Sequence, residues 1–168
     1  MIHVLFVCLG NICRSPMAEG LFKKMVEDAG LREHFFIESR ATSTLEIGNQ
    51  PHPRTAIILE REKAQLIGKK SQQITQEDFQ RFDYIIGMDH ENIKHLKKHA
   101  GFNQHKVYLL RDIDPNQKDQ IVPDPYYTGL YEDTYKLLKD GLKKWLNFYK
   151  KLLNEQKNSE NYAVFLNY

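Results

Sequence analysis

One segment near the N-terminus constrains the fold of this chain more than any other. Residues 2–7 are almost all apolar, and the run ends at Cys8. Such a run is typical of a strand buried on both faces of a parallel sheet. Arg14 comes six residues after the cysteine, and Ser15 and Pro16 then favour the N-cap and first turn of a helix. The segment therefore predicts a strand, a tight loop and a helix in direct succession.

The predicted loop has the composition of an anion-binding nest. Gly10 and Asn11 tolerate left-handed backbone conformations, so residues 9–14 can turn successive N–H groups inward. The N-terminus of the helix favours a phosphate and stabilises a thiolate. We expect Cys8 to be an ionised nucleophile and Arg14 to hold two phosphoryl oxygens. A cysteine at this place is often only a small core residue, but the full succession of residue types favours the phosphate site.

A second segment supplies an acid. Asp124 lies between Pro123 and Pro125, and the two rings restrict the loop that presents its carboxyl group. Transfer of a phosphoryl group from an aryl ester needs a proton on the departing oxygen, and one carboxyl group can later activate water. An ordinary Asp-Pro turn is the alternative interpretation.

These two segments resemble the signatures of the low-molecular-weight protein tyrosine phosphatases, and the chain resembles a bacterial-type member of that family. Residues 8–16 and 124–127 carry the likeness, which includes residues 39–43 and 82–89 and extends from residue 1 to about residue 153. The resemblance implies hydrolysis of phosphotyrosine in proteins, without a cofactor or a metal ion.

The resemblance also implies a role for each site residue. Cys8 would form a phosphocysteine intermediate, Arg14 would clamp the phosphate, and Asp124 would act as general acid and then as general base. Ser15 would hydrogen-bond the sulfur. The implied substrate-binding residues are Leu9, Gly10, Asn11, Ile12, Cys13, Leu45, Tyr126 and Tyr127. The implied loop-supporting residues are Asn11, Ser39 and Lys69.

Two positions depart from the better-known members of the family. Leu45 aligns with a tryptophan on the pocket rim, which alters the expected shape of the rim. Lys69 aligns with a histidine in the network that supports the loop, which alters how Asn11 is braced.

We also expect Cys13 to trap an oxidised Cys8 as a disulfide before the oxidation becomes irreversible.

Length and composition agree with a single enzyme domain. A chain of 168 residues with 41% hydrophobic residues can bury one sizeable core, and its net charge of +2 does not indicate nucleic-acid binding. The two cysteines, Cys8 and Cys13, form neither a disulfide framework nor the paired spacing of a structural zinc site. We expect a cytoplasmic protein without stable membrane association, as a monomer or weak dimer.

The rest of the chain alternates helices and strands. Helix-length connections between short apolar strands predict an α/β fold with a doubly wound, mainly four-stranded parallel sheet, helices on both faces and a phosphate-binding loop after the first strand. The predicted strands are 2–7, 35–39, 84–88 and 106–110. The predicted helices are 15–28, 53–63, 75–82, 90–98 and 135–153. We expect residues 1–153 to form one phosphatase domain and residues 154–168 to form a flexible tail.

Two further patterns have structural explanations. His90, His95 and His99 resemble a metal-ligand spacing, but the lysines around them indicate a solvated helix face. The apolar stripe of residues 135–153 could lie on a membrane surface, but packing against the sheet explains it better.

Four other functions are alternatives to hydrolysis of phosphotyrosine. A protein arginine phosphatase of the same family is the nearest alternative, because it shares nearly every catalytic residue. A phosphocysteine carrier needs no acid for an aryl leaving group, so Asp124 favours a hydrolase over a carrier. An arsenate reductase needs further thiols to relay electrons, and the chain has only two cysteines. A module that binds phosphotyrosine without turnover has no use for both Cys8 and Asp124.

Overall fold

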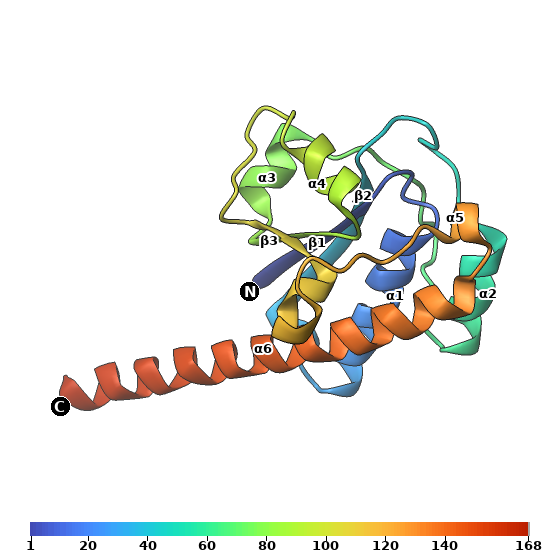
Figure 1. Cartoon of the computed structure of the whole chain (residues 1–168). Helices are drawn as coiled ribbons and strands as arrows, with labels where there is room; N and C mark the ends of the chain where they lie inside the picture. The colour runs from blue at the N-terminus through green and yellow to red at the C-terminus, as the bar shows by residue number, and fades with distance from the viewer. Residues whose placement is uncertain (168) are drawn as a thin grey trace.

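Four parallel strands form the centre of the molecule in the computed structural model, which describes residues 1–167 (Figure 1). The strands are β1 (Ile2–Cys8), β2 (Phe35–Ala41), β3 (Tyr84–Gly87) and β4 (Val107–Leu109). Their order is β2-β1-β3-β4, and every neighbouring pair is parallel. The chain winds to one side of β1 first and to the other side afterwards. The doubly wound four-stranded sheet is therefore confirmed, and its winding reverses at β1, where ligands bind in such folds.

Helices cover both faces of the sheet (Figure 1). Side chains alternate along β1, so Val4 and Phe6 pack into one core and Leu5 and Val7 into the other. The first core also receives α1 (Arg14–Asp28), α2 (Pro53–Arg61) and α6 (Tyr131–Leu166). The second core receives α3 (Gln76–Arg81) and α4 (His90–Leu96). The alternation explains why β1 reads as a nearly continuous apolar run.

Local signals set the ends of several elements. Thr75 and Asp89 cap α3 and α4 with reciprocal capping boxes, in which each side chain accepts from the N–H three residues later. Asp124 caps the short helix α5 (Pro125–Thr128) without a reciprocal box, because its side chain accepts from the Tyr126 N–H two residues later. Gly129 then ends α5 in the left-handed conformation, with φ of 73°. The remaining short elements are the 3-10 turns η1 (Arg32–His34), η2 (Leu110–Ile113) and η3 (Pro115–Gln117).

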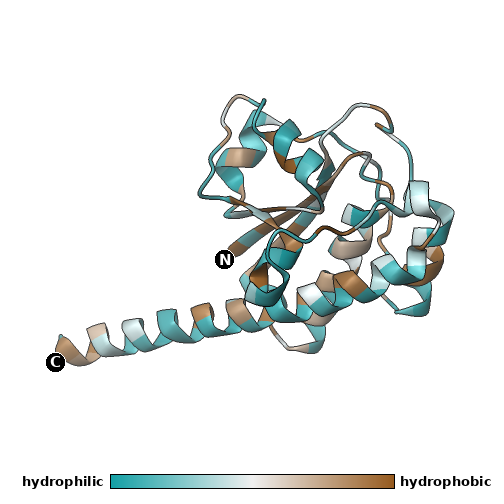
Figure 2. Cartoon of the chain, viewed as in Figure 1, coloured by the Kyte–Doolittle hydropathy of each residue, from teal (hydrophilic) through white to brown (hydrophobic). Residues whose placement is uncertain are grey.

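The last helix is longer than the sequence pattern predicted. It was expected over residues 135–153 and runs from Tyr131 to Leu166. No glycine or proline follows Gly141, so nothing in the chain interrupts the helix. Its first half packs on the sheet through Leu138, Leu142 and Trp145, as predicted, whereas its end projects from the body (Figures 1 and 2). The division at residue 153 and the flexibility of the tail stay predictions.

The hydropathy of the helices agrees with their positions around the sheet. Within residues 1–167, no helix is both long enough and apolar enough to cross a membrane. Along the first half of α6 the buried apolar residues face the sheet, whereas the projecting end carries exposed apolar residues (Figure 2).

Candidate active site

The predicted strand, loop and helix follow one another directly, and the loop lies at the carboxyl end of β1. Cys8 ends β1, and its Sγ atom lies 3.0 Å from the Ser15 Oγ atom. The Ser15 backbone N–H also points at this sulfur, at 3.4 Å. Asn11 adopts the left-handed conformation that the loop requires, with φ of 57°. The cysteine sulfur therefore lies directly at the N-terminus of α1.

One detail of the helix start differs from the prediction. Cys13, not Ser15, is the N-cap of α1, and it makes no capping hydrogen bond through its side chain. Ser15 lies one residue inside the helix, and its hydroxyl group is used by the loop instead. The first-turn N–H groups are thus left without a side-chain cap, which suits a site that binds an anion.

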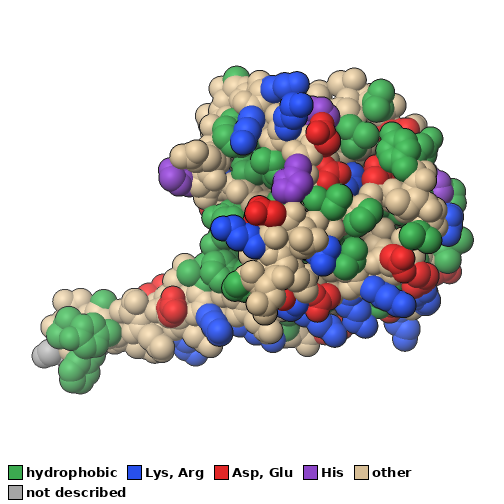
Figure 3. Space-filling view, viewed as in Figure 1, with side chains coloured by type: hydrophobic (Ala, Val, Ile, Leu, Met, Phe, Trp, Pro, Cys, Tyr) green, Lys and Arg blue, Asp and Glu red, His purple; other side chains and the backbone are tan. Residues whose placement is uncertain are grey.

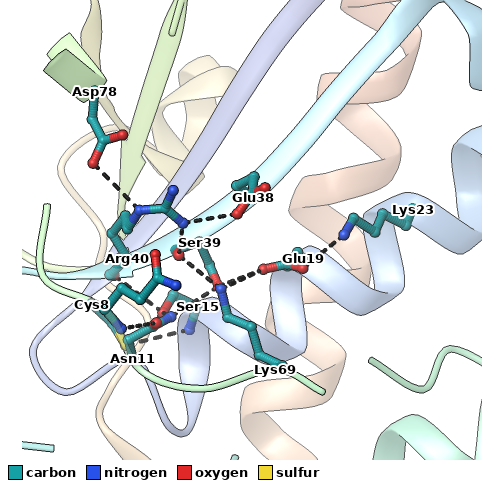
Figure 4. A network of polar contacts seen from close by, with 11 residues as sticks. Cys8, Asn11, Ser15, Glu19, Lys23, Glu38, Ser39, Arg40, Lys69 and Asp78 are labelled. Atoms are coloured by element: carbon teal, nitrogen blue, oxygen red, sulfur yellow. Dashed lines mark hydrogen bonds and ion pairs between the residues drawn. The ribbon is translucent and has the colours of Figure 1, made fainter. Parts of the chain in front are cut away.

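A buried network braces the loop from behind (Figure 4). The Asn11 Nδ2 group donates to Ser15 Oγ and to Ser39 Oγ, both at 2.8 Å. Ser39 Oγ in turn donates to Glu19 Oε1 at 2.7 Å. Ser15 Oγ accepts from Asn11, so its own hydrogen can be donated to the Cys8 sulfur at 3.0 Å or to the Arg40 carbonyl oxygen at 3.5 Å. The predicted pairing of Asn11 with Ser39 is present in the structure.

Lys69 closes this network at the surface (Figure 4). Its Nζ atom donates to the Ser39 carbonyl oxygen at 2.9 Å and lies 3.1 Å from Glu19 Oε1. Burial by itself would raise the pKa of Glu19, but the ammonium groups of Lys69 and Lys23 outweigh burial and lower it. Glu19 is therefore a buried carboxylate held by two cations. The sequence analysis placed Lys69 in the network but did not identify Glu19, whose only signal is a charge on the buried side of α1.

Arg14 is buried and pairs with two carboxylates. Its Nη1 atom lies 2.6 Å from Asp89 Oδ2 and donates to the Val122 carbonyl oxygen at 2.9 Å. Its Nη2 atom lies 3.3 Å from Asp124 Oδ2. Burial alone would lower the pKa of Arg14, but Cys8, Asp89 and Asp124 together raise it, so the guanidinium group stays charged. The Arg14 Nε atom is buried and has no partner among the described residues.

Asp89 is a further residue of the candidate site that was not predicted from the sequence. It lies two residues after β3 and caps α4, so an ordinary capping role explains its presence in the sequence. A signal existed, because the carboxyl ends of parallel strands share one edge of the sheet. That edge brings Asp89 to Arg14, although 75 residues separate them in the chain.

A cavity of about 260 Å³ opens above the loop. Cys8 and Asp124 both line it, so the predicted nucleophile and the predicted acid share one space. Leu45 and Tyr127 form exposed parts of the wall, each 73% exposed. Glu46 also lines the cavity and was not predicted. The lining residues are Cys8, Leu9, Gly10, Ile12, Cys13, Leu45, Glu46, Asp124, Tyr126 and Tyr127.

The second cysteine borders the same cavity. Both Cys8 and Cys13 are free thiols. The Cys13 Sγ atom lies 3.4 Å from the Tyr131 Oη atom at the start of α6. Burial raises the pKa of Cys13 to about 11, against a smaller opposite effect of the Tyr131 hydrogen bond. Cys13 is therefore a protonated thiol at neutral pH.

The predicted histidine pattern does not gather into a metal site. His90 Nε2 contacts the Asp119 carbonyl oxygen at 2.9 Å, and His99 packs its ring near Phe79. Among residues 1–167, no group of three or more histidine, cysteine, aspartate or glutamate residues is placed to hold a metal ion.

Comparison with known proteins identifies the family. The family model described as low molecular weight phosphotyrosine protein phosphatase matches residues 3–159. The chain belongs to this family. YfkJ, a low molecular weight protein-tyrosine-phosphatase of Bacillus subtilis, is 44% identical over 147 residues, which cover 87% of this chain and 94% of YfkJ.

Solved structures agree with the family assignment. The crystal structure of YfkJ has a TM-score of 0.86 and covers 90% of this chain and 96% of its own. SP-PTP, a low molecular weight protein tyrosine phosphatase from Streptococcus pyogenes, is 47% identical with a TM-score of 0.75, over 88% and 92% of the two chains. DARP, the drosophila arginine phosphatase, has a TM-score of 0.77 at 29% identity, over 88% and 97% of the two chains. The fold by itself does not separate the two activities.

Proposed function

We propose that this protein is a phosphatase that hydrolyses phosphotyrosine in proteins through a phosphocysteine intermediate. The observation that carries the proposal is the shared cavity, in which Cys8 lies at the base and Asp124 in the wall, with Arg14 buried beside both. Membership of the family and the names of its relatives support the same activity.

The first step is attack of the Cys8 thiolate on phosphorus. The phosphorus–oxygen bond to the tyrosine breaks, and Asp124 gives its proton to the departing phenolate oxygen. Arg14 and the N–H groups at the start of α1 stabilise the equatorial oxygens. The unpaired Nε–H of Arg14 is a donor available to the phosphate while its Nη1 atom stays paired with Asp89.

The second step releases phosphate. Asp124, now ionised, takes a proton from water, and the water oxygen attacks phosphorus as the phosphorus–sulfur bond breaks. The Ser15 hydroxyl group, 3.0 Å from the sulfur, stabilises the departing thiolate. Asn11 holds that hydroxyl beside the sulfur, because it donates to Ser15 Oγ, and the contact of Ser15 Oγ with the sulfur is shorter than its 3.5 Å contact with the Arg40 carbonyl oxygen.

The walls of the cavity favour a tyrosine substrate over arginine. Ile12 and Tyr127 present apolar and aromatic surface to the substrate. A flat phenyl ring gains free energy by burial and stacking there, whereas the guanidinium group of phosphoarginine would lose hydrogen bonds to water. Phosphoserine has a short stem and does not reach the base of the cavity.

We assign the protein to reducing compartments such as the cytoplasm, since both cysteines are free.

The test is an assay of matched peptides that carry phosphotyrosine, phosphoserine or phosphoarginine, with and without a chelator. We expect turnover of phosphotyrosine that the chelator does not change. Cys8→Ser should abolish turnover, and Asp124→Asn should lower kcat by about 10²–10⁴, the usual contribution of a positioned acid. A parent enzyme that is faster on phosphoarginine would replace the tyrosine assignment, and full activity of Cys8→Ser would refute the covalent mechanism.

A further inference from the structure

The end of α6 carries an apolar surface that the phosphatase fold does not use. Beyond Tyr149, only Leu152 and Leu153 are half-buried, and every residue from 154 to 167 is exposed. Tyr162, Val164, Phe165 and Leu166 are 58% to 77% exposed. The family match ends at residue 159, so most of this apolar tip lies outside it. Figure 3 shows the tip as a hydrophobic cluster at the end of the projecting helix.

Residues on one face of this helix follow a regular pattern. Positions that are alternately four and three residues apart lie on one face of an α-helix. From the point where α6 leaves the body, this face is apolar at both ends and polar in the middle. We call these residues the tail stripe: Phe148, Leu152, Glu155, Ser159, Tyr162 and Leu166.

The inner end of the tail stripe is also accessible. The Phe148 side chain packs edge-on against Tyr84, with 6.0 Å between ring centroids, and is 38% exposed. Leu152 next to it is half-buried. Figure 3 shows hydrophobic surface where the helix leaves the body, and more at its tip. The two apolar ends are about 27 Å apart, given the rise of the helix over these residues.

We propose that the tail stripe pairs with the tail stripe of a second copy of this chain, as an antiparallel helix pair about a two-fold axis. An axis midway between residues 155 and 159 places Phe148 opposite Leu166, and Leu152 opposite Tyr162. It also places Glu155 opposite Ser159. Apolar residues meet apolar ones and polar residues meet polar ones, and the symmetry makes every contact twice. The pattern is therefore complementary to itself.

Other arrangements fit the tail stripe less well. A parallel pair would place Glu155 against Glu155, and like charges at such positions repel. Helices that lie on lipid surfaces carry basic residues on their polar face. Residues 148–166, which span the tail stripe, contain three lysines and two glutamates, so this segment is nearly neutral and not strongly basic. A second copy is the occupant that both the charges and the spacing favour.

The pairing leaves the active site open. Cys8 lies at the carboxyl end of β1, and the start of α6 borders that end through the contact of Tyr131 with Cys13. The helix then runs away from the site and ends at the projecting C-terminal tip (Figure 1). Dimerisation through the tail stripe is therefore independent of turnover.

The test is sedimentation velocity of the full chain over a wide range of protein concentration. We expect the mean mass to rise with concentration from 19.8 kDa toward twice that value. Tyr162→Glu places a charge opposite Leu152 and should weaken dimerisation by tenfold or more, because an unpaired charge is costly to bury. Val164→Glu puts the same charge at the same tip but on the opposite face of the helix, so it should dimerise like the parent.

A pair of substitutions at Ser159 tests the direction of the helices. In the antiparallel pair this residue faces Glu155 of the second copy, so Ser159→Lys should strengthen the dimer and Ser159→Glu should weaken it. In a parallel pair Ser159 would face Ser159 of the second copy, so either lysine or glutamate at this position would place like charges together and weaken the dimer. Circular dichroism should show that the tail stays helical in each variant, and kcat/KM on a phosphotyrosine peptide should be unchanged throughout.

Three results would overturn the proposal. The first is a parent chain that stays at 19.8 kDa at every concentration. The second is equal loss of dimer in Tyr162→Glu and Val164→Glu, which would indicate non-specific contacts of the tip. The third is co-sedimentation of a monomeric chain with phosphatidylcholine–phosphatidylserine vesicles, lost in Tyr162→Glu, which would assign the surface to a membrane.

Discussion

Lys69→Met isolates the contribution of the buried network to both stability and catalysis. Methionine keeps the length and packing of the side chain but removes the ammonium group. That group lies 3.1 Å from Glu19 Oε1 and donates to the Ser39 carbonyl oxygen at 2.9 Å. The side chains are 10% and 4% exposed for Lys69 and Glu19, so solvent screens the pair only weakly.

The expected loss of stability follows from what remains around Glu19. Removing one partner of a buried ion pair costs about 3–5 kcal/mol when the other charge is left alone. Here Lys23 still lies 2.8 Å from Glu19 Oε2, and Ser39 still donates to Oε1. We therefore expect Lys69→Met to lower the free energy of unfolding by about 2 kcal/mol at neutral pH, below the range for an abandoned charge.

The pH dependence has a defined sign. The folded protein lowers the pKa of Glu19, chiefly through Lys69 and Lys23 acting against burial, so the stabilisation is present above the ordinary glutamate pKa of 4.5. It is lost as the pH falls through the lower, folded value. Lys69→Met raises the folded pKa of Glu19, so parent and variant should differ most near neutral pH. The difference should narrow below pH 4.5.

Catalysis should decline with the same substitution. Glu19 holds Ser39, and Ser39 holds the left-handed Asn11 that aims Ser15 at the sulfur. We expect kcat to fall by about tenfold, the equivalent of roughly 1.4 kcal/mol in the transition state. A loosened loop weakens the contacts with the phosphoryl group more than those with the substrate ring. KM should therefore change less than kcat.

Urea unfolding at several pH values and steady-state kinetics measure both effects. Lys23→Met is the matched control, because it removes the other ammonium group from the same carboxylate. The Lys23 side chain is 45% exposed, so solvent screening should limit its contribution to less than about 1 kcal/mol. If Lys69→Met matches the parent in both unfolding and kcat at neutral pH, the network does not brace the loop.

Three further predictions follow from the site. Asp89→Asn removes a carboxylate from Arg14 and should lower kcat about tenfold while the protein stays folded; unchanged kcat in stopped-flow assays would show that Asp89 does not position the guanidinium group. Cys13→Ser should keep its activity but recover poorly with thiols after peroxide, because Cys13 traps oxidised Cys8 as a disulfide with loss of water; equal recovery of variant and parent would contradict this role. Ile12→Thr should shift the ratio of kcat/KM values toward phosphoarginine, and an unchanged ratio on matched peptides would assign specificity to other parts of the cavity.

Local sequence predicted the parts of the site that local backbone geometry creates. The strand ending at Cys8 and the helix after Arg14 both occur as predicted, because burial and helix propensity act over a few residues. The two prolines around Asp124 likewise marked a presented carboxyl group, which caps α5 and faces the cavity. The doubly wound parallel sheet was likewise predicted from alternating elements of suitable length.

The errors of prediction also have local causes. Ser15 and Pro16 favour the start of a helix in general, but Ser15 bonds to the sulfur and to Asn11, so the helix begins one residue earlier. The predicted end of the last helix at residue 153 was also wrong, because the residues after Leu153 contain no helix breaker and continue α6. The change of composition after Leu153 marks the point where the helix becomes exposed to solvent, and the backbone stays helical there.

The sequence by itself determined the strand, the loop and the presence of the helix that follows, and it predicts Cys8 as the nucleophile, while the tertiary structure decided which charges meet. Asp89 reaches Arg14 across 75 residues, and Tyr131 reaches Cys13 across 118. Lys69 reaches Glu19 only because the connection after α2 passes beside α1 and β2. Each of these side chains would be an ordinary polar residue if considered alone. A local pattern specifies backbone angles and burial, whereas ion pairs and hydrogen bonds between distant segments depend on how the packed sheet and helices bring those segments together.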